Sequence, residues 1–237
     1  MIARFEELDW QATRMGELTL RRRVDPETGE PIYEVKLKDE FLMSSLFTVA
    51  EEALATLGLA RAEGADLDVL VGGLGLGYTA ATALGDDRVR SLHVIDALPA
   101  VIGWHEKELL PVSVQLVRDP RTTLVHDDFF AVVRRPAGPE DARYDVILLD
   151  VAHSPRHPLD PSHADLYTGA GLASLARHLT DRGVFALWSD DPPDPDFMST
   201  LSSVLDGCAA HVVEFDNRLT GGTSSNTVYV ATRRTHS

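Results

Sequence analysis

The sequence predicts an α/β protein built on a doubly wound, mostly parallel sheet. Two observations support this prediction. Between residues 39 and 205, short apolar runs typical of buried strands alternate with segments of helical periodicity. The run Leu67 to Val71 is followed by Gly73, Gly75 and Gly77 and then by an Ala-rich segment. This order of strand, glycine turn and helix is the arrangement that receives a nucleotide, although glycine turns also close ordinary strand-to-helix connections.

The composition is that of an ordinary globular chain with an acidic balance. Of the 237 residues, 44% are hydrophobic and 25% are charged, and the formal net charge is −15. This charge argues against nucleic acid as a partner, because phosphate binding needs a basic face, and it is compatible with a cationic substrate. The single cysteine, Cys208, excludes an intrachain disulfide and a thiol-rich metal site. No stretch approaches the ~20 apolar residues of a membrane span, so we expect a cytoplasmic protein with no membrane partner.

The first part of the chain is predicted to form a β-hairpin. Residues 17–23 and 32–37 alternate in polarity, and turn residues fill the segment 25–31 between them. We therefore expect a small N-terminal β element over 1–38, followed by a nucleoside-binding catalytic domain over 39–237.

Changes of period along the chain predict the remaining elements. From Asp39 the apolar residues fall at helical spacing, and Gly58 supplies a stop, so we expect a helix over 41–57. A glycine loop at 220–222 joins the last two strands, which predicts a terminal antiparallel hairpin that closes the sheet. The other expected strands are 91–95, 121–126, 144–149, 184–188, 211–215 and 227–231, and the other expected helices are 97–106, 164–178 and 197–205.

Three of the predicted strands end in carboxylates, namely Asp96, Asp127 and Asp150. In an open parallel sheet the carboxyl ends of the strands lie on one rim, beside the ligand crevice. Asp96 lies roughly 20 residues beyond the glycines, where a carboxylate accepts the hydroxyls of a ribose. The alternative for each aspartate is that its side chain caps the helix that follows, and the two roles do not exclude each other.

Two further polar clusters have open interpretations. The acidic segment 190–196, which includes the substrate-binding candidate Asp190, forms either an acidic mouth for a cationic substrate or a solvated turn stiffened by proline. The histidines of the proline-rich segment 151–163 match no helical or finger-type ligand spacing, so we predict no metal site.

The order of these motifs resembles the spermidine synthase family, the polyamine aminopropyltransferases. The resemblance implies a Rossmann-like fold of the class I S-adenosylmethionine-dependent methyltransferase type. It also implies S-adenosylmethionine or its decarboxylated form as co-substrate, a small-molecule acceptor such as a polyamine, and a homodimer. The residues that carry it are Asp39-Glu40-Phe41, the glycine motif, Asp96 with Pro99-Ala100-Val101, Asp119-Pro120-Arg121, Asp127 with Phe129, Tyr144-Asp145-Val146-Ile147 with Asp150, Leu166-Tyr167-Thr168 and Gly183-Val184.

The resemblance also implies roles for single residues. Asp96 would hold the ribose hydroxyls, and Asp127, next to Asp128, would hold the adenine amino group. The turn of Gly73, Gly75 and Gly77 would lie under the nucleoside. Asp150 would face the reacting centre and orient the amine, and Tyr167 is a further substrate-binding candidate.

The chain departs from the family pattern at three places. Gly75 stands where the family carries an acidic residue that grips the propylamine arm of the donor. His153 replaces the second aspartate of the catalytic loop, and we consider it either a catalytic base, since imidazole titrates near pH ~6.5, or a structural histidine. Met43-Ser44-Ser45 replaces a Tyr followed by Gln or His and Glu.

Three functions therefore stay open. The first is aminopropyl transfer to an amine. The second is methyl transfer to a small molecule, because Gly75 in place of an acidic residue removes a repulsion against the carboxylate of intact S-adenosylmethionine. The third is a non-catalytic relative that binds a nucleoside and has lost the amine site.

Overall fold

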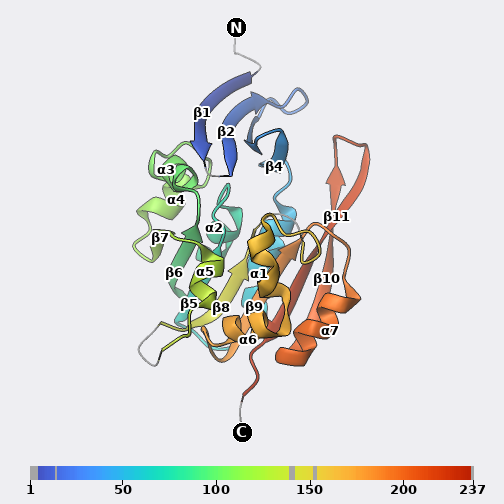
Figure 1. Ribbon diagram of the computed structural model, residues 1–237. Coiled ribbons are helices and arrows are strands. Elements are labelled where there is room, and N and C mark those ends of the chain that lie inside the picture. Colours follow the sequence, from blue (N-terminus) through green and yellow to red (C-terminus); the bar gives the residue numbers. More distant parts are fainter. Residues whose placement is uncertain (1–4, 14, 139–141, 152–153, 236–237) are drawn as a thin grey trace.

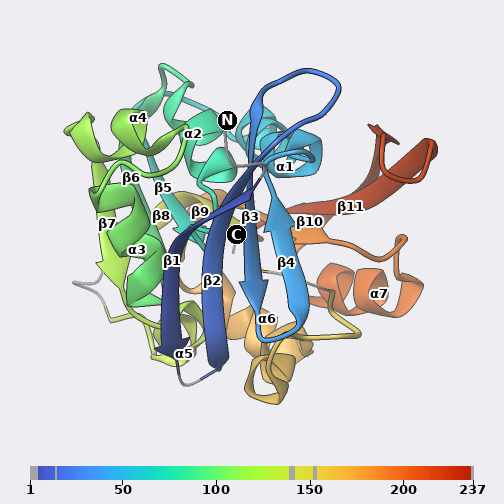
Figure 2. The ribbon, with the colours of Figure 1, turned by 90° about the horizontal axis from the view of Figure 1, so that it is seen from above.

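The computed structural model describes residues 5–13, 15–138, 142–151 and 154–235, which form two sheets (Figure 1). The smaller sheet is antiparallel, with its four strands in chain order. Viewed from above, it lies across the top of the molecule (Figure 2). Its strands are β1 (Phe5–Thr13), β2 (Gly16–Val24), β3 (Pro31–Leu37) and β4 (Glu40–Ser44).

The larger sheet has seven strands in the order β10-β11-β9-β8-β5-β6-β7. The pairs among β7, β6, β5, β8 and β9 are parallel, whereas β11 is antiparallel to both β9 and β10. This confirms the doubly wound α/β fold with a terminal antiparallel hairpin. The strands are β5 (Leu67–Gly72), β6 (Val89–Asp96), β7 (Thr122–His126), β8 (Tyr144–Leu149), β9 (Leu179–Ser189), β10 (Asp206–Asn217) and β11 (Gly222–Thr232).

Helices cover both faces of the seven-stranded sheet, and each face has its own core. Along β5, Val69 and Val71 belong to one buried cluster and Leu70 to the other, because successive strand residues point to opposite faces. Helices α1 to α4 pack on the first cluster and α5 to α7 on the second. The helices are α1 (Val49–Arg61), α2 (Tyr78–Leu84), α3 (Pro99–Glu106), α4 (Ser113–Arg118), α5 (Phe129–Arg134), α6 (Gly169–Ala176) and α7 (Pro195–Val204), with a 3₁₀ helix over Pro161–Tyr167.

The prediction of one helix over 41–57 is wrong in its first half. Residues 40–44 form β4, which pairs with β3, and α1 begins only at Val49. The apolar residues of β4 face a cavity and a neighbouring strand, so tertiary packing overrides the helical spacing. The predicted hairpin is thus extended to four strands by β1 and β4. The boundary between residues 38 and 39 stays a prediction, and the small sheet reaches Ser44.

The prediction of one helix over 164–178 is also corrected. A 3₁₀ helix ends at Tyr167, and α6 begins at Gly169. Thr168 separates them because its hydroxyl accepts the backbone N–H of Gly171 and so caps α6.

Candidate functional site

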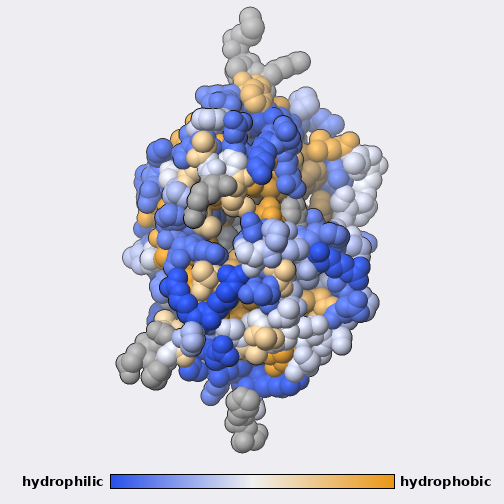
Figure 3. Space-filling view, viewed as in Figure 1, coloured by the Kyte–Doolittle hydropathy of each residue, from blue (hydrophilic) through white to orange (hydrophobic). Residues whose placement is uncertain are grey.

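One cavity of about 580 Å³ lies between the carboxyl rim of the seven-stranded sheet and the four-stranded sheet above it. Apolar residues show between hydrophilic ones below the small sheet on the face seen in Figure 3. The rim contributes the ends of β5, β6 and β8, and the small sheet contributes residues from β2, β3 and β4. The predicted convergence of strand ends on one rim therefore produces a cavity of the size that small-molecule ligands occupy.

The glycine turn is held in place by close backbone contacts. Gly73 has φ +95°, and a Cβ there would lie 1.9 Å from the backbone oxygen of Asp150. The carbonyl of Gly75 accepts a hydrogen bond from Nε2 of His105 at 3.0 Å, and Nδ1 of the same ring accepts from the hydroxyl of Ser113 at 3.2 Å. Burial lowers the pKa of His105, which favours the neutral ring, and in that form Nδ1 accepts from the Ser113 hydroxyl.

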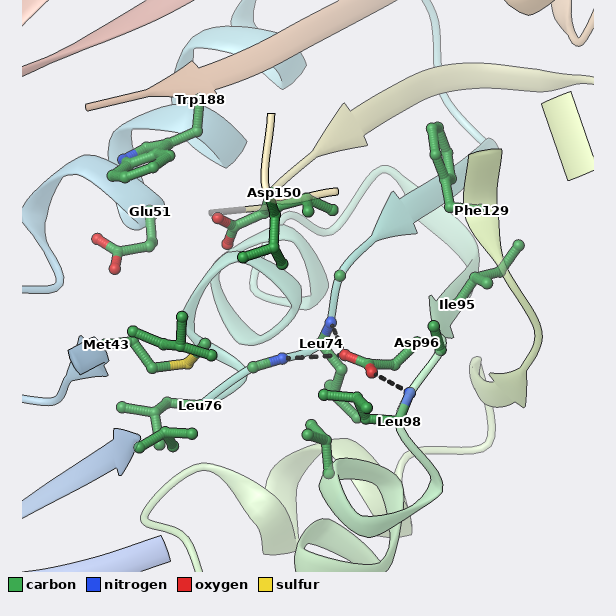
Figure 4. Close-up of a pocket in the computed structure, with 18 of the residues that line it drawn as sticks. Met43, Glu51, Leu74, Leu76, Ile95, Asp96, Leu98, Phe129, Asp150 and Trp188 are labelled. Carbon is green, nitrogen blue, oxygen red and sulfur yellow. Dashed lines mark hydrogen bonds between the residues drawn. The ribbon is translucent and has the colours of Figure 1, made fainter. Parts of the chain in front are cut away.

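The side chain of Asp96 accepts backbone N–H groups and lines the cavity at the same time. Its Oδ2 accepts the backbone N–H of Leu74 at 2.9 Å and that of Gly75 at 3.5 Å, and its Oδ1 accepts the N–H of Leu98 at 2.8 Å (Figure 4). Burial raises the pKa of Asp96, and the three N–H groups oppose that rise. The carboxylate is still partly exposed to the cavity, so its remaining lone pairs are available to ligand hydroxyls.

Asp127 and Asp128 have different surroundings. Asp128 lines the cavity, and its side chain accepts the N–H of Phe130 at the start of α5. Asp127 is not among the lining residues. Its Oδ1 accepts the N–H of Asp128 at 2.8 Å, and its Oδ2 lies 3.4 Å from Arg135. The role of Asp127 toward an adenine amino group stays a prediction.

Two stacked aromatic rings, those of Phe130 and His163, line the cavity together with Asp128. The rings of Phe130 and His163 stack with centroids 3.7 Å apart and 5° between their planes. His163 Nδ1 is buried and has no hydrogen-bond partner in the described part of the chain, and burial lowers the pKa of the ring. Phe129 lies beside Ile95 on the same side as Asp96 (Figure 4). A flat base is the kind of group that these rings would contact.

A second carboxylate lies beside Asp150, and the sequence analysis missed it. Glu51 is in the first turn of α1, and its side chain points to the same part of the cavity as Asp150 (Figure 4). The hydroxyl of Thr79 links the two elements, since its oxygen lies 2.5 Å from Oδ2 of Asp150 and 3.1 Å from the carbonyl oxygen of Glu51. An acidic residue in a first helical turn is common on electrostatic grounds, so Glu51 carries no distinctive signal in the sequence.

Burial and the repulsion between like charges disfavour the ionised forms of Glu51 and Asp150. Burial, followed by the charge of Asp150, raises the pKa of Glu51 to about 8. Burial also raises the pKa of Asp150 to about 6, with a further contribution from Asp96, while the Thr79 hydroxyl opposes the rise. Near neutral pH the pair therefore holds about one proton, and a bound cation would favour its release.

Apolar side chains surround the pair. Trp188, on β9, lies next to Glu51 in Figure 4, and Met43, on β4, lies on the other side of it. A Cβ at Gly75 would lie 2.9 Å from the Sδ atom of Met43. Met43 therefore occupies the space into which an acidic side chain at position 75 would extend.

The loop after β8 is fastened to the acidic segment. The hydroxyl of Ser154 donates to Asp191 at 2.6 Å, and Arg156 donates to both carboxylate oxygens of Asp194 at 2.7 and 2.8 Å. Asp194 also caps α7. Neither of these two carboxylates lines the cavity, and the interpretation of the segment as an acidic mouth stays a prediction.

Other candidates lie away from the cavity or outside the described residues. Asp190 and Tyr167 are not among the residues that line the cavity, and the ring of Tyr167 packs on Phe197. Ala152 and His153 lie outside the described residues, so His153 stays a prediction. Among the described residues, no group of three or more His, Cys, Asp and Glu side chains is placed to hold a metal. Within the same residues, no helix is both long and apolar enough to cross a membrane.

Comparisons with known proteins agree with this architecture. No protein-family model matches the chain. The polyamine aminopropyltransferase of Shewanella oneidensis is 26% identical over 195 residues, which are 77% of this chain and 33% of the relative. The chain thus spans about a third of the length of this curated relative. The match confirms the resemblance to aminopropyltransferases that the motifs indicate.

Solved structures of spermidine synthases share the fold. The enzyme from Thermotoga maritima aligns with a TM-score of 0.74 at 19% identity, over 96% of this chain and 73% of that one. A spermidine synthase in complex with the transition-state analogue AdoDATO aligns with a TM-score of 0.75 at 18% identity, over 96% and 74% of the two chains. These matches cover both sheets of the present chain.

Proposed function

We propose that this chain, which resembles the spermidine synthases in sequence and fold, transfers an aminopropyl group from decarboxylated S-adenosylmethionine to an amine. The observation that supports this most is the charge of the cavity. Its described lining contains five carboxylates and neither lysine nor arginine. Such a cavity suits a ligand with two positive groups, and the donor has a sulfonium and a terminal ammonium. The lining carboxylates are Glu51, Asp96, Asp128, Asp150 and Asp160.

The nucleoside end is assigned to the half of the cavity around Asp96. The ribose hydroxyls would donate to Asp96, whose own contacts with Leu74 and Leu98 fix its orientation. The backbone of the glycine turn would lie under the sugar, since glycine permits this close approach. The base would lie near Phe129 and His163, which both line the cavity. This arrangement directs the sulfonium and its arm toward Asp150 and Glu51.

The reaction is a displacement at carbon. The lone pair of a neutral amine attacks the arm's methylene carbon next to sulfur, and a C–N bond forms as the C–S bond breaks. The bonding electrons go to sulfur, so neutral methylthioadenosine leaves. The amine nitrogen then loses a proton to Asp150, whose pKa of about 6 suits a base near neutral pH. Holding both reactants in line supplies much of the rate.

Glu51 and Asp150 are assigned to different groups of the two reactants. The reaction brings two nitrogen groups to this end of the cavity, namely the ammonium of the donor's arm and the acceptor amine. Asp150, at the end of β8, is assigned to the attacking amine. Glu51, on α1, is assigned to the arm ammonium, and it thereby supplies a charge that the glycine motif lacks at Gly75.

Methyl transfer from intact S-adenosylmethionine is the alternative that the sequence left open. Gly75 removes one carboxylate, but Glu51 and Asp150 together would still repel the carboxylate of a methionine arm. A non-catalytic nucleoside-binding relative remains the other alternative. A homodimer formed through the N-terminal strands stays a prediction.

The test is the identity of the nucleoside product. Purified protein is incubated with each donor and a mixture of primary amines, and products are separated by mass spectrometry. We expect methylthioadenosine together with an amine enlarged by one aminopropyl group, and no such product from Asp150→Asn. Formation of S-adenosylhomocysteine from the intact donor would instead establish methyl transfer. Absence of both products, with nucleoside binding intact, would support the non-catalytic relative.

A further inference from the structure

We propose that His105 is a positioning residue for the nucleoside, because it holds the peptide between Gly75 and Leu76 so that the N–H of Leu76 donates to a ribose oxygen. This inference rests on the proposed function, which places the ribose on the glycine turn. It concerns a side chain that lies behind the turn and contacts no ligand itself.

One backbone N–H group of the turn has no partner. Every N–H in residues 73–77 except that of Leu76 donates either to a backbone carbonyl or to the carboxylate of Asp96. Among the described residues, the N–H of Leu76 has no hydrogen-bond partner. Leu76 is 5% exposed, and it lines the cavity. Buried N–H groups nearly always have a partner, so we assign this one to the ligand.

His105 lies on the other side of this peptide. Its Nε2 is 3.0 Å from the carbonyl oxygen of Gly75, and this nitrogen carries the proton because a carbonyl can only accept. The peptide is trans and planar, so the N–H of Leu76 points away from His105. The ring of His105 is buried and does not line the cavity, whereas Gly75 and Leu76 do. The N–H of Leu76 therefore lies on the cavity side of the turn.

Ser113 fixes the orientation of the imidazole. Its Oγ accepts the N–H of Leu110 at 3.2 Å and lies 3.2 Å from Nδ1 of His105. In the neutral ring, which burial favours by lowering the pKa of His105, Nδ1 accepts the hydroxyl proton of Ser113. Each ring nitrogen thus has its own partner, and the ring cannot turn without losing one of them.

The hydrogen bond from His105 matters because the Gly75 peptide has few other restraints. Gly75 has φ +49°, and its own N–H lies 3.5 Å from Asp96, which is a long hydrogen bond. Glycine also has the widest choice of backbone conformations. Without the contact with His105, the peptide can rotate, and the N–H of Leu76 would turn away from the ribose.

The test is the affinity for methylthioadenosine, measured by calorimetry in the wild type and in two variants of His105. His105→Leu removes both ring nitrogens, and we expect the Kd to rise about tenfold. His105→Gln keeps a donor for the carbonyl of Gly75 and an acceptor for Ser113, so we expect a Kd within about threefold of the wild type. An unchanged Kd in His105→Leu overturns the proposal. A loss in His105→Gln as large as that in His105→Leu overturns it as well.

Leu116→Ala is the control that separates positioning from packing. Leu116 is buried behind the turn, since a Cβ at Gly77 would lie 2.9 Å from its Cδ1 atom, and its side chain cannot donate a hydrogen bond. We expect a lower midpoint in urea denaturation and an unchanged Kd. A Kd that rises as much as in His105→Leu would assign the effect to packing and overturn the proposal.

Ser113→Ala provides the test if His105→Leu does not fold. This variant removes the partner of Nδ1 and leaves the ring in place. We expect the Kd for methylthioadenosine to rise about threefold, and a wild-type Kd overturns the proposal.

The amide of Leu76 gives a readout that packing alone does not change. In protein with isotope-labelled leucine, its signal is identified by its loss in Leu76→Ile. We expect methylthioadenosine to shift the amide proton downfield in the wild type and in His105→Gln, but not in His105→Leu. A signal that does not move in the wild type contradicts the hydrogen bond to the ribose.

These binding measurements require no turnover. Absence of aminopropyl transfer with these binding results intact would therefore count against the proposed function alone. Failure of methylthioadenosine to bind the wild type would overturn the role of His105.

Discussion

Replacement of Glu51 by glutamine is expected to stabilise the unliganded protein while it damages the site. Burial and the nearby Asp150 raise the pKa of Glu51 from 4.5 to about 8. The unfolded chain releases this proton from about pH 4.5, whereas the folded protein holds it until about pH 8. The wild type therefore loses stability as the pH rises through that window, and a neutral glutamine does not.

The size of the effect follows from the pKa of Glu51. At about 1.4 kcal/mol for each unit of pKa, a rise from 4.5 to about 8 costs the folded state about 5 kcal/mol once Glu51 is ionised. At pH 7 the cost is about 3 kcal/mol, and at pH 4 it is close to zero. Glu51→Gln should thus gain about 3 kcal/mol in free energy of unfolding at pH 7 and more at pH 9. A site that holds repelling charges to bind a cation commonly trades stability for function.

The assay is urea denaturation of both proteins at pH 4, 7 and 9 without ligand. The matched control is Glu52→Gln, because Glu52 is exposed and adjacent, and its replacement should change the free energy of unfolding by less than about 0.5 kcal/mol at each pH. A difference between wild type and Glu51→Gln that does not grow with pH would refute the buried carboxylate pair.

Three further variants test other contacts of the site. Asp96→Asn keeps the size of the side chain and should lower the affinity for methylthioadenosine at least tenfold, as measured by calorimetry, and an unchanged affinity would remove Asp96 from the ribose. Thr79→Val removes the hydroxyl that lowers the pKa of Asp150. The acid limb of the pH profile of kcat/KM should therefore move to higher pH by roughly 0.5 to 1 pH unit. A shift to lower pH would contradict the assignment of Asp150 as the base. Gly73→Ala should cost more than about 2 kcal/mol in urea denaturation, because its Cβ would overlap the backbone of Asp150, and a wild-type midpoint would contradict the tight turn.

The sequence predicts those parts of the site that depend on strand ends. Asp96 and Asp150 directly follow buried strands, and parallel pairing of β5 with β6 and β8 brings both to one rim. The two proposed roles of Asp96 coexist, since it accepts three backbone N–H groups and still lines the cavity. At Asp96 and Asp150 the position after a buried strand and the parallel sheet topology both predict a place on the rim.

The parts that the sequence does not predict depend on packing between distant segments. Glu51 reaches Asp150 only because α1 packs beside β8 and α2. Residues 41–43 have helical spacing, but pairing with β3 makes them a strand and turns them into a cavity wall. The acidic segment near Asp194 has the composition of a solvated turn or of a cation site, and only the contact with Arg156 shows that it fastens a loop.

The most direct test of the proposed function is a side-by-side comparison of decarboxylated S-adenosylmethionine, intact S-adenosylmethionine and methylthioadenosine as stabilising ligands. A ligand present at a hundred times its Kd stabilises the folded state by about 2.7 kcal/mol, which raises the Tm of a chain of this size by about 5 to 10 °C. We expect the largest rise with the decarboxylated donor, because its ammonium meets Glu51 and Asp150, and a small rise with the intact one. A larger rise with intact S-adenosylmethionine would contradict the acidic donor site and indicate methyl transfer.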